Sequence, residues 1–324
     1  MANNLSNLVN LMVKNNKYAV GSASMEITTH CPFRCKLCYL VPQAKQHIKP
    51  EIMRKYVEEL SQTIGTYDFH IFGGEPFLNH IGIEELVETF FELDFFPADS
   101  LGIVASGYVL PSRAMAALDK ASKEIVKRGG MGTYLTFTNH EYLADAILAH
   151  RGIDPESLAG ADPAIKEWIL EEVRKETVSR LGQSEIDFSD PHPFKLYPNI
   201  VTNVRDYEEV GEVKLADVGN ATTIQGQRFF HKNDVEHMNP NMVIGYEPYG
   251  RLQLKSLGID NEGNIKKRGL DTSEGTKQNN HGNIKDGLQG AVLNQATYSE
   301  TIGRAVECQN KNVRQHYSAS IMSL

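Results

Sequence analysis

Three of the four cysteines in this chain lie in one short segment, and this segment constrains the chemistry more than any other. Cys31, Cys35 and Cys38 occur in the sequence CPFRCKLCY, with three residues between the first two and two residues between the last two. Thiolates bind soft and borderline metals, and this spacing lets a tight loop wrap one metal cluster with three thiolates. The segment therefore predicts an iron or zinc site.

The number of candidate ligands favours iron over zinc. A closed structural zinc site takes four tetrahedral ligands, commonly in two pairs. Cys308 lies far from the other three in the sequence, and we interpret it as an ordinary cysteine. His30 directly abuts Cys31 and is badly placed to reach a fourth vertex. The pattern favours an iron–sulfur cluster with three cysteine ligands.

Composition and charge exclude several classes of partner. The chain has 324 residues, 41% of them hydrophobic and 23% charged, as in an ordinary globular protein. Its formal net charge of −8 argues against nucleic acid or an anionic membrane as the main partner. The sequence has no apolar run near the roughly 18 residues that a membrane span requires, and no signal-peptide pattern at its start. We expect a cytoplasmic protein that binds a small molecule or a peptide.

Strand-like and helix-like patterns alternate through the first half of the chain. Strands are expected at 25–29, 68–72, 101–105 and 133–138, and helices at 50–64, 83–93 and 112–128. Extended segments at 194–197 and 212–215 would complete five or six parallel strands. Parallel βαβ units gather their functional loops at the carboxyl ends of the strands. The cysteine segment follows the first strand and therefore lies on that rim.

A Gly-Gly-Glu-Pro segment, residues 73–76, follows the second predicted strand. An ammonium group needs hydrogen-bond acceptors, and glycine lets the main chain approach a ligand closely. A lone segment of this kind is usually a structural turn. Because it comes one βα unit after the cysteines, we interpret it as part of the same site.

The cysteine pattern and the Gly-Gly-Glu segment together resemble the radical SAM superfamily. The resemblance implies a partial (β/α)6 TIM-like barrel and one [4Fe-4S] cluster bound by Cys31, Cys35 and Cys38. The fourth iron would chelate S-adenosylmethionine, and one electron from a donor such as flavodoxin or ferredoxin would cleave it. The products would be methionine and a 5′-deoxyadenosyl radical that abstracts hydrogen from the substrate.

The resemblance also assigns cofactor contacts to the ends of the predicted strands. Tyr39 would lie against the adenine, the Gly-Gly-Glu-Pro segment would hold the ammonium group, and Ser106 would touch the ribose or carboxylate. Thr138, Asn139 and Arg151 would bind the carboxylate, although a structural turn or a surface ion pair explains them equally well. The full set is Tyr39, Gly73, Gly74, Glu75, Pro76, Ser106, Thr138, Asn139 and Arg151. The residue that completes the reaction is not identified.

We predict three parts in this α/β chain. An N-terminal helix over 1–20 precedes the barrel over 21–224, and a small C-terminal α/β appendage covers 225–324. A charged helical insertion is expected at about 154–183, either as a lid over the site or as a cover for one side of the barrel. Residues 259–265 are expected to form a β-hairpin that turns on Glu262 and Gly263.

The C-terminal appendage suggests the substrate class. Residues 259–265 and 281–286 resemble the SPASM or twitch appendage of peptide-modifying radical SAM enzymes, but they contain no cysteine to hold auxiliary clusters. This implies a peptide substrate, such as a ribosomally made precursor that is crosslinked, epimerised or shortened in its backbone. The residues before the first strand are too few for a leader-recognition domain, so a separate leader-binding protein is expected.

Two alternatives remain open on the sequence. The same radical chemistry can act on a small molecule, for which the loss of auxiliary clusters is equally natural. A non-catalytic iron–sulfur or zinc sensor would also use the three cysteines. A sensor has no need of the Gly-Gly-Glu-Pro segment, and this argues against that alternative.

Overall fold

The computed structural model describes the barrel core, the ends of its strands and part of the C-terminal region. The described residues are 14–16, 18–33, 45–107, 110–139, 148–149, 152–154, 157, 164–165, 168, 172, 199–206, 215–216, 229–230, 244–246, 252–266 and 280–297. Within them, no helix is long and apolar enough to cross a membrane.

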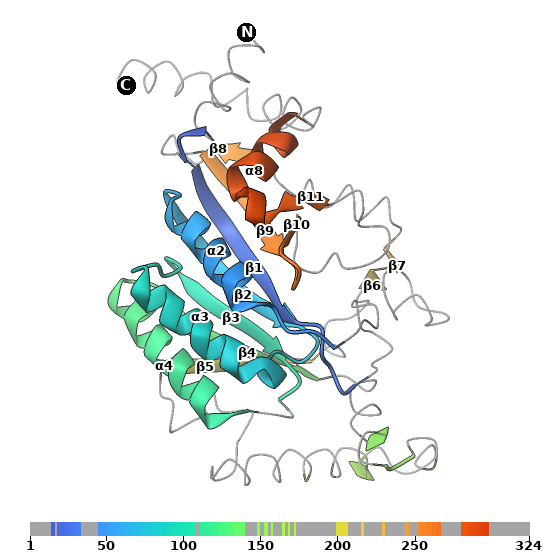
Figure 1. Cartoon of the computed structure of the whole chain (residues 1–324). Coiled ribbons are helices and arrows are strands. Elements are labelled where there is room, and N and C mark those ends of the chain that lie inside the picture. The colour runs from blue at the N-terminus through green and yellow to red at the C-terminus, as the bar shows by residue number, and fades with distance from the viewer. Residues whose placement is uncertain are drawn as a thin grey trace.

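Six parallel strands form the centre of the main sheet, in the order β9-β1-β2-β3-β4-β5 (Figure 1). They are β1 (Tyr18–Thr28), β2 (Gly65–Gly73), β3 (Ser100–Ala105), β4 (Gly132–Asn139), β5 (Ile200–Asp206) and β9 (Leu252–Ile259). Three antiparallel strands, β8 (Ile244–Tyr246), β10 (Asn264–Lys266) and β11 (Asn280–Asn283), extend the sheet beyond β9. Among the described strands the sheet does not close on itself, which confirms the predicted α/β partial barrel.

Three helices cover one face of this sheet: α2 (Pro50–Ser61), α3 (His80–Glu92) and α4 (Ser112–Lys127) (Figure 1). Each connects two neighbouring parallel strands, as βαβ units require. Alternate strand residues point at the helices, so Met25 and Ile27 of β1 are fully buried in the core. Phe69 of β2 packs between the rings of Tyr56 and Phe90, and burying such a side chain stabilises the fold by about 1.5–3 kcal/mol.

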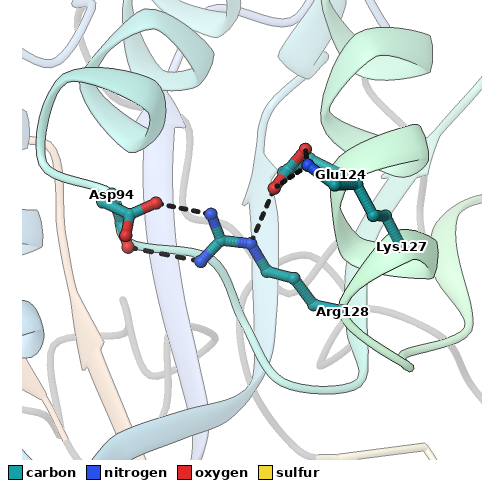
Figure 2. Close-up of polar contacts among 4 residues, drawn as sticks. All are labelled: Asp94, Glu124, Lys127 and Arg128. Atoms are coloured by element: carbon teal, nitrogen blue, oxygen red, sulfur yellow. Dashed lines mark hydrogen bonds and ion pairs between the residues drawn. The ribbon is translucent and has the colours of Figure 1, made fainter.

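Polar contacts join the ends of α3 and α4 (Figure 2). Arg128, at the end of α4, forms ion pairs with Asp94 at 2.5 Å and with Glu124 at 3.0 Å. Its guanidinium group also lies 4.5 Å from the centre of the Phe96 ring. Lys127 forms a second ion pair with Glu124 at 3.3 Å. The guanidinium group therefore links the end of α3 to the last turn of α4.

The outer strands differ from the sequence prediction. The fifth parallel strand is β5 at 200–206, while the predicted segment 194–197 lies outside the described residues. The sixth is β9, which pairs with β1 at the opposite side of the sheet. Of the predicted strand 212–215, Leu215 belongs to β6 (Leu215–Ala216), which pairs with β7 (Phe229–Phe230) in a separate sheet. Pairing between distant segments overrides what a local pattern can predict.

Three further predictions concern the regions around the barrel. Strand β1 begins at Tyr18, so the last three residues of the predicted N-terminal segment 1–20 belong to a strand. Most of that segment and most of the insertion at 154–183 lie outside the described residues. The hairpin over 259–265 is confirmed, because β9 and β10 pair antiparallel around Asp260 to Gly263. Strand β11, the 3-10 turn η5 (Ile284–Asp286) and helix α8 (Leu288–Thr297) follow it.

Candidate cluster and cofactor site

The cysteine segment leaves β1 and returns to it through a short ladder of hydrogen bonds. Thr29 donates its N–H to the Gln46 carbonyl at 2.9 Å, and Ile48 donates to the Ile27 carbonyl at 3.0 Å. Thr28 and His47 form the bridge between these two bonds, with Thr28 Oγ1 and His47 Nδ1 2.8 Å apart. We call residues 27–29 and 46–48 the neck. The neck closes the base of the segment that carries the three cysteines.

The Gly-Gly-Glu turn packs directly against this segment. The N–H of Gly74 donates to the Thr28 carbonyl at 2.8 Å, and the N–H of Glu75 donates to the His30 carbonyl at 2.9 Å. A Cβ atom on Gly74 would lie 2.5 Å from the His30 carbonyl oxygen and 2.8 Å from the Cys31 Cβ. Only a residue without a side chain fits this approach. The Gly-Gly-Glu turn therefore lies directly against the start of the cysteine segment.

A third strand joins the site through the Glu75 side chain. The Glu75 carboxylate accepts hydrogen bonds from the Ser106 N–H at 2.9 Å and from the Ser106 hydroxyl, and its other oxygen accepts from the Phe77 N–H at 3.5 Å. Glu75 is 1% exposed, and this burial raises the pKa of its carboxyl group. The carboxylate thus ties the end of β2 to the residue that follows β3.

The structure describes only some of the remaining predicted site residues. Pro76 begins the 3-10 turn η1 (Pro76–Asn79) and is buried beneath the Gly-Gly-Glu turn. The backbone of Thr138 and Asn139 ends β4, at the same edge of the sheet as Ser106, while their side chains are outside the described part. Cys31 is partly exposed at the start of its segment. Cys35, Cys38, Tyr39, Arg151 and Cys308 lie outside the described residues.

The sequence prediction missed a buried carboxylate on β1. Glu26 is 1% exposed and points to the face of the sheet opposite the helices, between the core residues Met25 and Ile27. Its Oε2 accepts the N–H of Asn261 at 3.3 Å, while its Oε1 has no hydrogen-bond partner among the described residues. Burial raises the pKa of Glu26 to about 7. A charged residue within an apolar strand was the available signal.

A second missed feature spans the middle of the same face. His70 on β2 and Tyr134 on β4 flank Gly102 on β3 in one register row. The Tyr134 hydroxyl lies 3.2 Å from His70 Nδ1, directly above Gly102, where any Cβ atom would come within 2.5 Å of that hydroxyl. Val104, two residues further along β3, is 44% exposed. Val104 is therefore accessible on this face of the sheet.

Residues 21–127 match the family model of a 4Fe-4S single-cluster domain. This segment is therefore similar to 4Fe-4S domains. The match begins in β1, includes all three clustered cysteines and the Gly-Gly-Glu turn, and ends in α4. It covers about a third of the chain. The match supports the iron–sulfur cluster predicted from the cysteine spacing.

Several solved structures are similar to this chain over most of its length. BtrN in complex with AdoMet and 2-DOIA has a TM-score of 0.41 and 13% identity, over 87% of each chain. Streptococcus suis SuiB bound to S-adenosylmethionine has a TM-score of 0.45 and 14% identity, over 90% of this chain and 70% of SuiB. Native anSMEcpe with bound AdoMet and Kp18Cys peptide has a TM-score of 0.44 and 12% identity, over 86% and 82%.

These similarities are too distant to transfer a substrate or a reaction. No curated protein matches the sequence. The proposed function therefore rests on the residues of the candidate site itself.

Proposed function

We propose that this chain is a radical SAM enzyme that abstracts hydrogen from a peptide substrate. The observation that carries the proposal is the contact between the Gly-Gly-Glu turn and the cysteine segment, in which Gly74 packs on His30 and Cys31 without room for a side chain. An iron–sulfur protein that only senses or stores metal has no need of this turn. A ligand bound by both the turn and the cluster would explain why the turn lies against the cysteine segment.

The residues of the site fit a cluster and S-adenosylmethionine. Cys31 begins the three-thiolate segment, the neck closes that segment, and the glycines allow the main chain of the turn to approach a bound molecule. When bound, the cluster and S-adenosylmethionine supply a one-electron cleavage that yields methionine and a radical able to take a hydrogen atom. We also propose that an external donor such as flavodoxin or ferredoxin supplies the electron.

In this proposal Glu75 has a positioning role. Its carboxylate already accepts two hydrogen bonds from Ser106 and one from Phe77, so it orients the ends of β2 and β3 around the cofactor. Backbone carbonyls of the turn are then left to accept the ammonium group. Ser106, Thr138 and Asn139, which end neighbouring strands, would contact the remainder of S-adenosylmethionine.

The peptide substrate is proposed from the C-terminal region. Strands β9 and β10 form a hairpin, followed by β11 and α8, and the sequence of this region resembles a SPASM or twitch appendage. Its sequence from 259 to 286 has no cysteine for an auxiliary cluster. The substrate would be a ribosomally made precursor peptide, brought by a separate leader-binding protein. Genes for a short precursor and a small leader-binding protein beside this one would support this part.

The chemistry is tested by reconstituting the chain anaerobically with iron and sulfide, then adding dithionite and S-adenosylmethionine. We expect 5′-deoxyadenosine and methionine. If the cluster is intact and no 5′-deoxyadenosine forms, the radical SAM proposal is wrong. A non-catalytic sensor would then be the better interpretation. Cys35→Ala should lose both cluster and cleavage, whereas Cys308→Ser should keep both.

A further inference from the structure

The C-terminal hairpin reaches the neck of the cysteine segment through one residue, Asn261. Its side-chain Nδ2 donates to Gln46 Oε1 at 3.1 Å, and its backbone N–H donates to Glu26 Oε2 at 3.3 Å. Gln46 belongs to the neck, and Glu26 directly precedes the neck on β1. Asn261 is itself buried, at 6% exposure. It therefore links both sides of the neck to a segment more than 200 residues away.

The turn that presents Asn261 is rigid. Asp260 accepts hydrogen bonds from the N–H groups of Glu262 and Asn264, at 3.0 and 2.8 Å, and also forms an ion pair with Lys266 at 3.4 Å. Gly263 has a φ of +83°, a conformation that L-residues rarely adopt. An Asx-type turn with these internal bonds holds its second residue in one orientation.

The turn is also anchored to the core. A Cβ atom on Gly263 would lie 2.8 Å from the Ile284 side chain and 3.0 Å from the Ile52 side chain, so the turn packs between η5 and α2. The N–H of Ile284 donates to the Gly263 carbonyl at 2.8 Å. Helix α2 follows the neck shortly after Ile48. The turn therefore packs against the same helix that the neck leads into. A displacement of the turn would be transmitted to Gln46.

We propose that Asn261 is a positioning residue for the cluster, acting through Gln46 and Glu26 to fix the neck that carries Cys31. The C-terminal hairpin thereby sets how the cysteine segment is held and how stably it keeps its iron. This inference rests on the proposed function only in placing a cluster on that segment. It gives the C-terminal hairpin, which contains no cysteine, a role in the site that does not require an auxiliary cluster.

The test compares two substitutions of Gln46 in the full-length, anaerobically reconstituted chain. Gln46→Met keeps the length of the side chain but removes the acceptor, whereas Gln46→Glu keeps an acceptor oxygen for Asn261. Hydrogen exchange of the Thr29 and Ile48 amides reports on the neck, because these two N–H groups close it. Loss of the hydrogen bond between Asn261 and Gln46, worth about 1 kcal/mol, should speed the exchange of these two amides by roughly fivefold.

We expect faster exchange and faster release of iron to a chelator in Gln46→Met and in Asn261→Ala. Gln46→Glu should restore wild-type exchange and iron retention. Gln62→Met is the matched control, since Gln62 is also exposed and accepts from an Asn side chain, that of Asn16 at 3.5 Å, but lies at the far end of α2. It should leave both measurements unchanged. The midpoint potential of the cluster should shift in the two disrupted variants and not in Gln62→Met.

Wild-type exchange at Thr29 and Ile48 in both Gln46→Met and Asn261→Ala would overturn the proposal. So would a Gln46→Glu variant that behaves like Gln46→Met, because the effect would then not depend on the hydrogen bond. These measurements need no S-adenosylmethionine. A wild-type chain that binds a cluster but makes no 5′-deoxyadenosine would contradict the proposed function and leave this inference standing.

Discussion

The Glu75 carboxylate accepts hydrogen bonds from both the backbone N–H and the hydroxyl group of Ser106. This contact joins the end of β2 to the end of β3 at the edge of the sheet where the cysteine segment begins. It makes the buried Glu75 a structural part of the site. The contact therefore holds these strand ends together at the proposed cofactor site.

Replacement of Glu75 by alanine should lower the free energy of unfolding by about 3 kcal/mol, because the buried Ser106 N–H loses its acceptor. Ser106→Ala removes the hydroxyl group and keeps the N–H bond, so its cost should be about 1 kcal/mol. Urea unfolding of the two variants measures both values. Equal losses of unfolding free energy in the two variants would show that the hydrogen bond from the Ser106 N–H to Glu75 adds nothing to stability.

Gly74→Ala should disturb the contact between the two motifs. The new Cβ would lie 2.5 Å from the His30 carbonyl oxygen, and relieving this overlap should cost about 1–3 kcal/mol. We also expect less iron bound per chain after reconstitution. Gly65→Ala is the control, because no atom lies within 4 Å of a Cβ at that position of β2. A Gly74→Ala variant with full iron content and stability would contradict the packing described for this turn.

Glu26 should make stability depend on pH in the neutral range. Burial raises its pKa from 4.5 to about 7, so the folded state holds this proton more tightly than the unfolded state. The free energy of unfolding should therefore fall as pH rises from about 4.5 to about 7, by roughly 3 kcal/mol in all. Glu26→Gln removes this loss and should be more stable than wild type at pH 8.

Chemical denaturation at pH 5 and pH 8 tests the Glu26 prediction. The exposed Glu88→Gln variant serves as the control and should follow the wild-type pH dependence. Identical pH dependence in wild type and Glu26→Gln would show that this carboxyl group titrates alike in the folded and unfolded chains.

Gly102→Ala should separate His70 from Tyr134. Its Cβ would come within 2.5 Å of the Tyr134 hydroxyl and 2.8 Å of His70 Nδ1, which breaks the bond between them at a cost of about 1 kcal/mol. Tyr134→Phe removes the same bond directly. The double variant should cost less than the sum of the two single variants, since both remove one interaction. Additive costs would mean that Gly102 is needed for another reason.

The centre of the fold follows from local patterns in the sequence. Alternating apolar residues and helical periodicity place β2 to β4 and helices α2 to α4 close to their observed bounds, whereas β1 begins at Tyr18, well before the predicted strand at 25–29. The pairing of β9 with β1 was beyond such patterns, because Ala23 and Leu257 are brought together across most of the chain. A strand's pattern indicates that it is buried but does not identify its neighbour.

The site was predictable to a similar degree. The positions of Gly74, Glu75 and Ser106 at strand ends followed from the motifs and the parallel topology. The bond between Glu75 and Ser106, and the link from Asn261 to Gln46, depend on side-chain orientations and on hairpin placement. Glu26 was overlooked because a single charged residue in an apolar strand is usually paired or exposed.

The most direct test of the account is the electron paramagnetic resonance spectrum of the reduced, reconstituted chain with and without S-adenosylmethionine. If Cys31 and the Gly-Gly-Glu turn form one site with an open iron, addition of S-adenosylmethionine should change the g-values of the reduced [4Fe-4S] signal. A [4Fe-4S] signal that S-adenosylmethionine leaves unchanged would contradict the account.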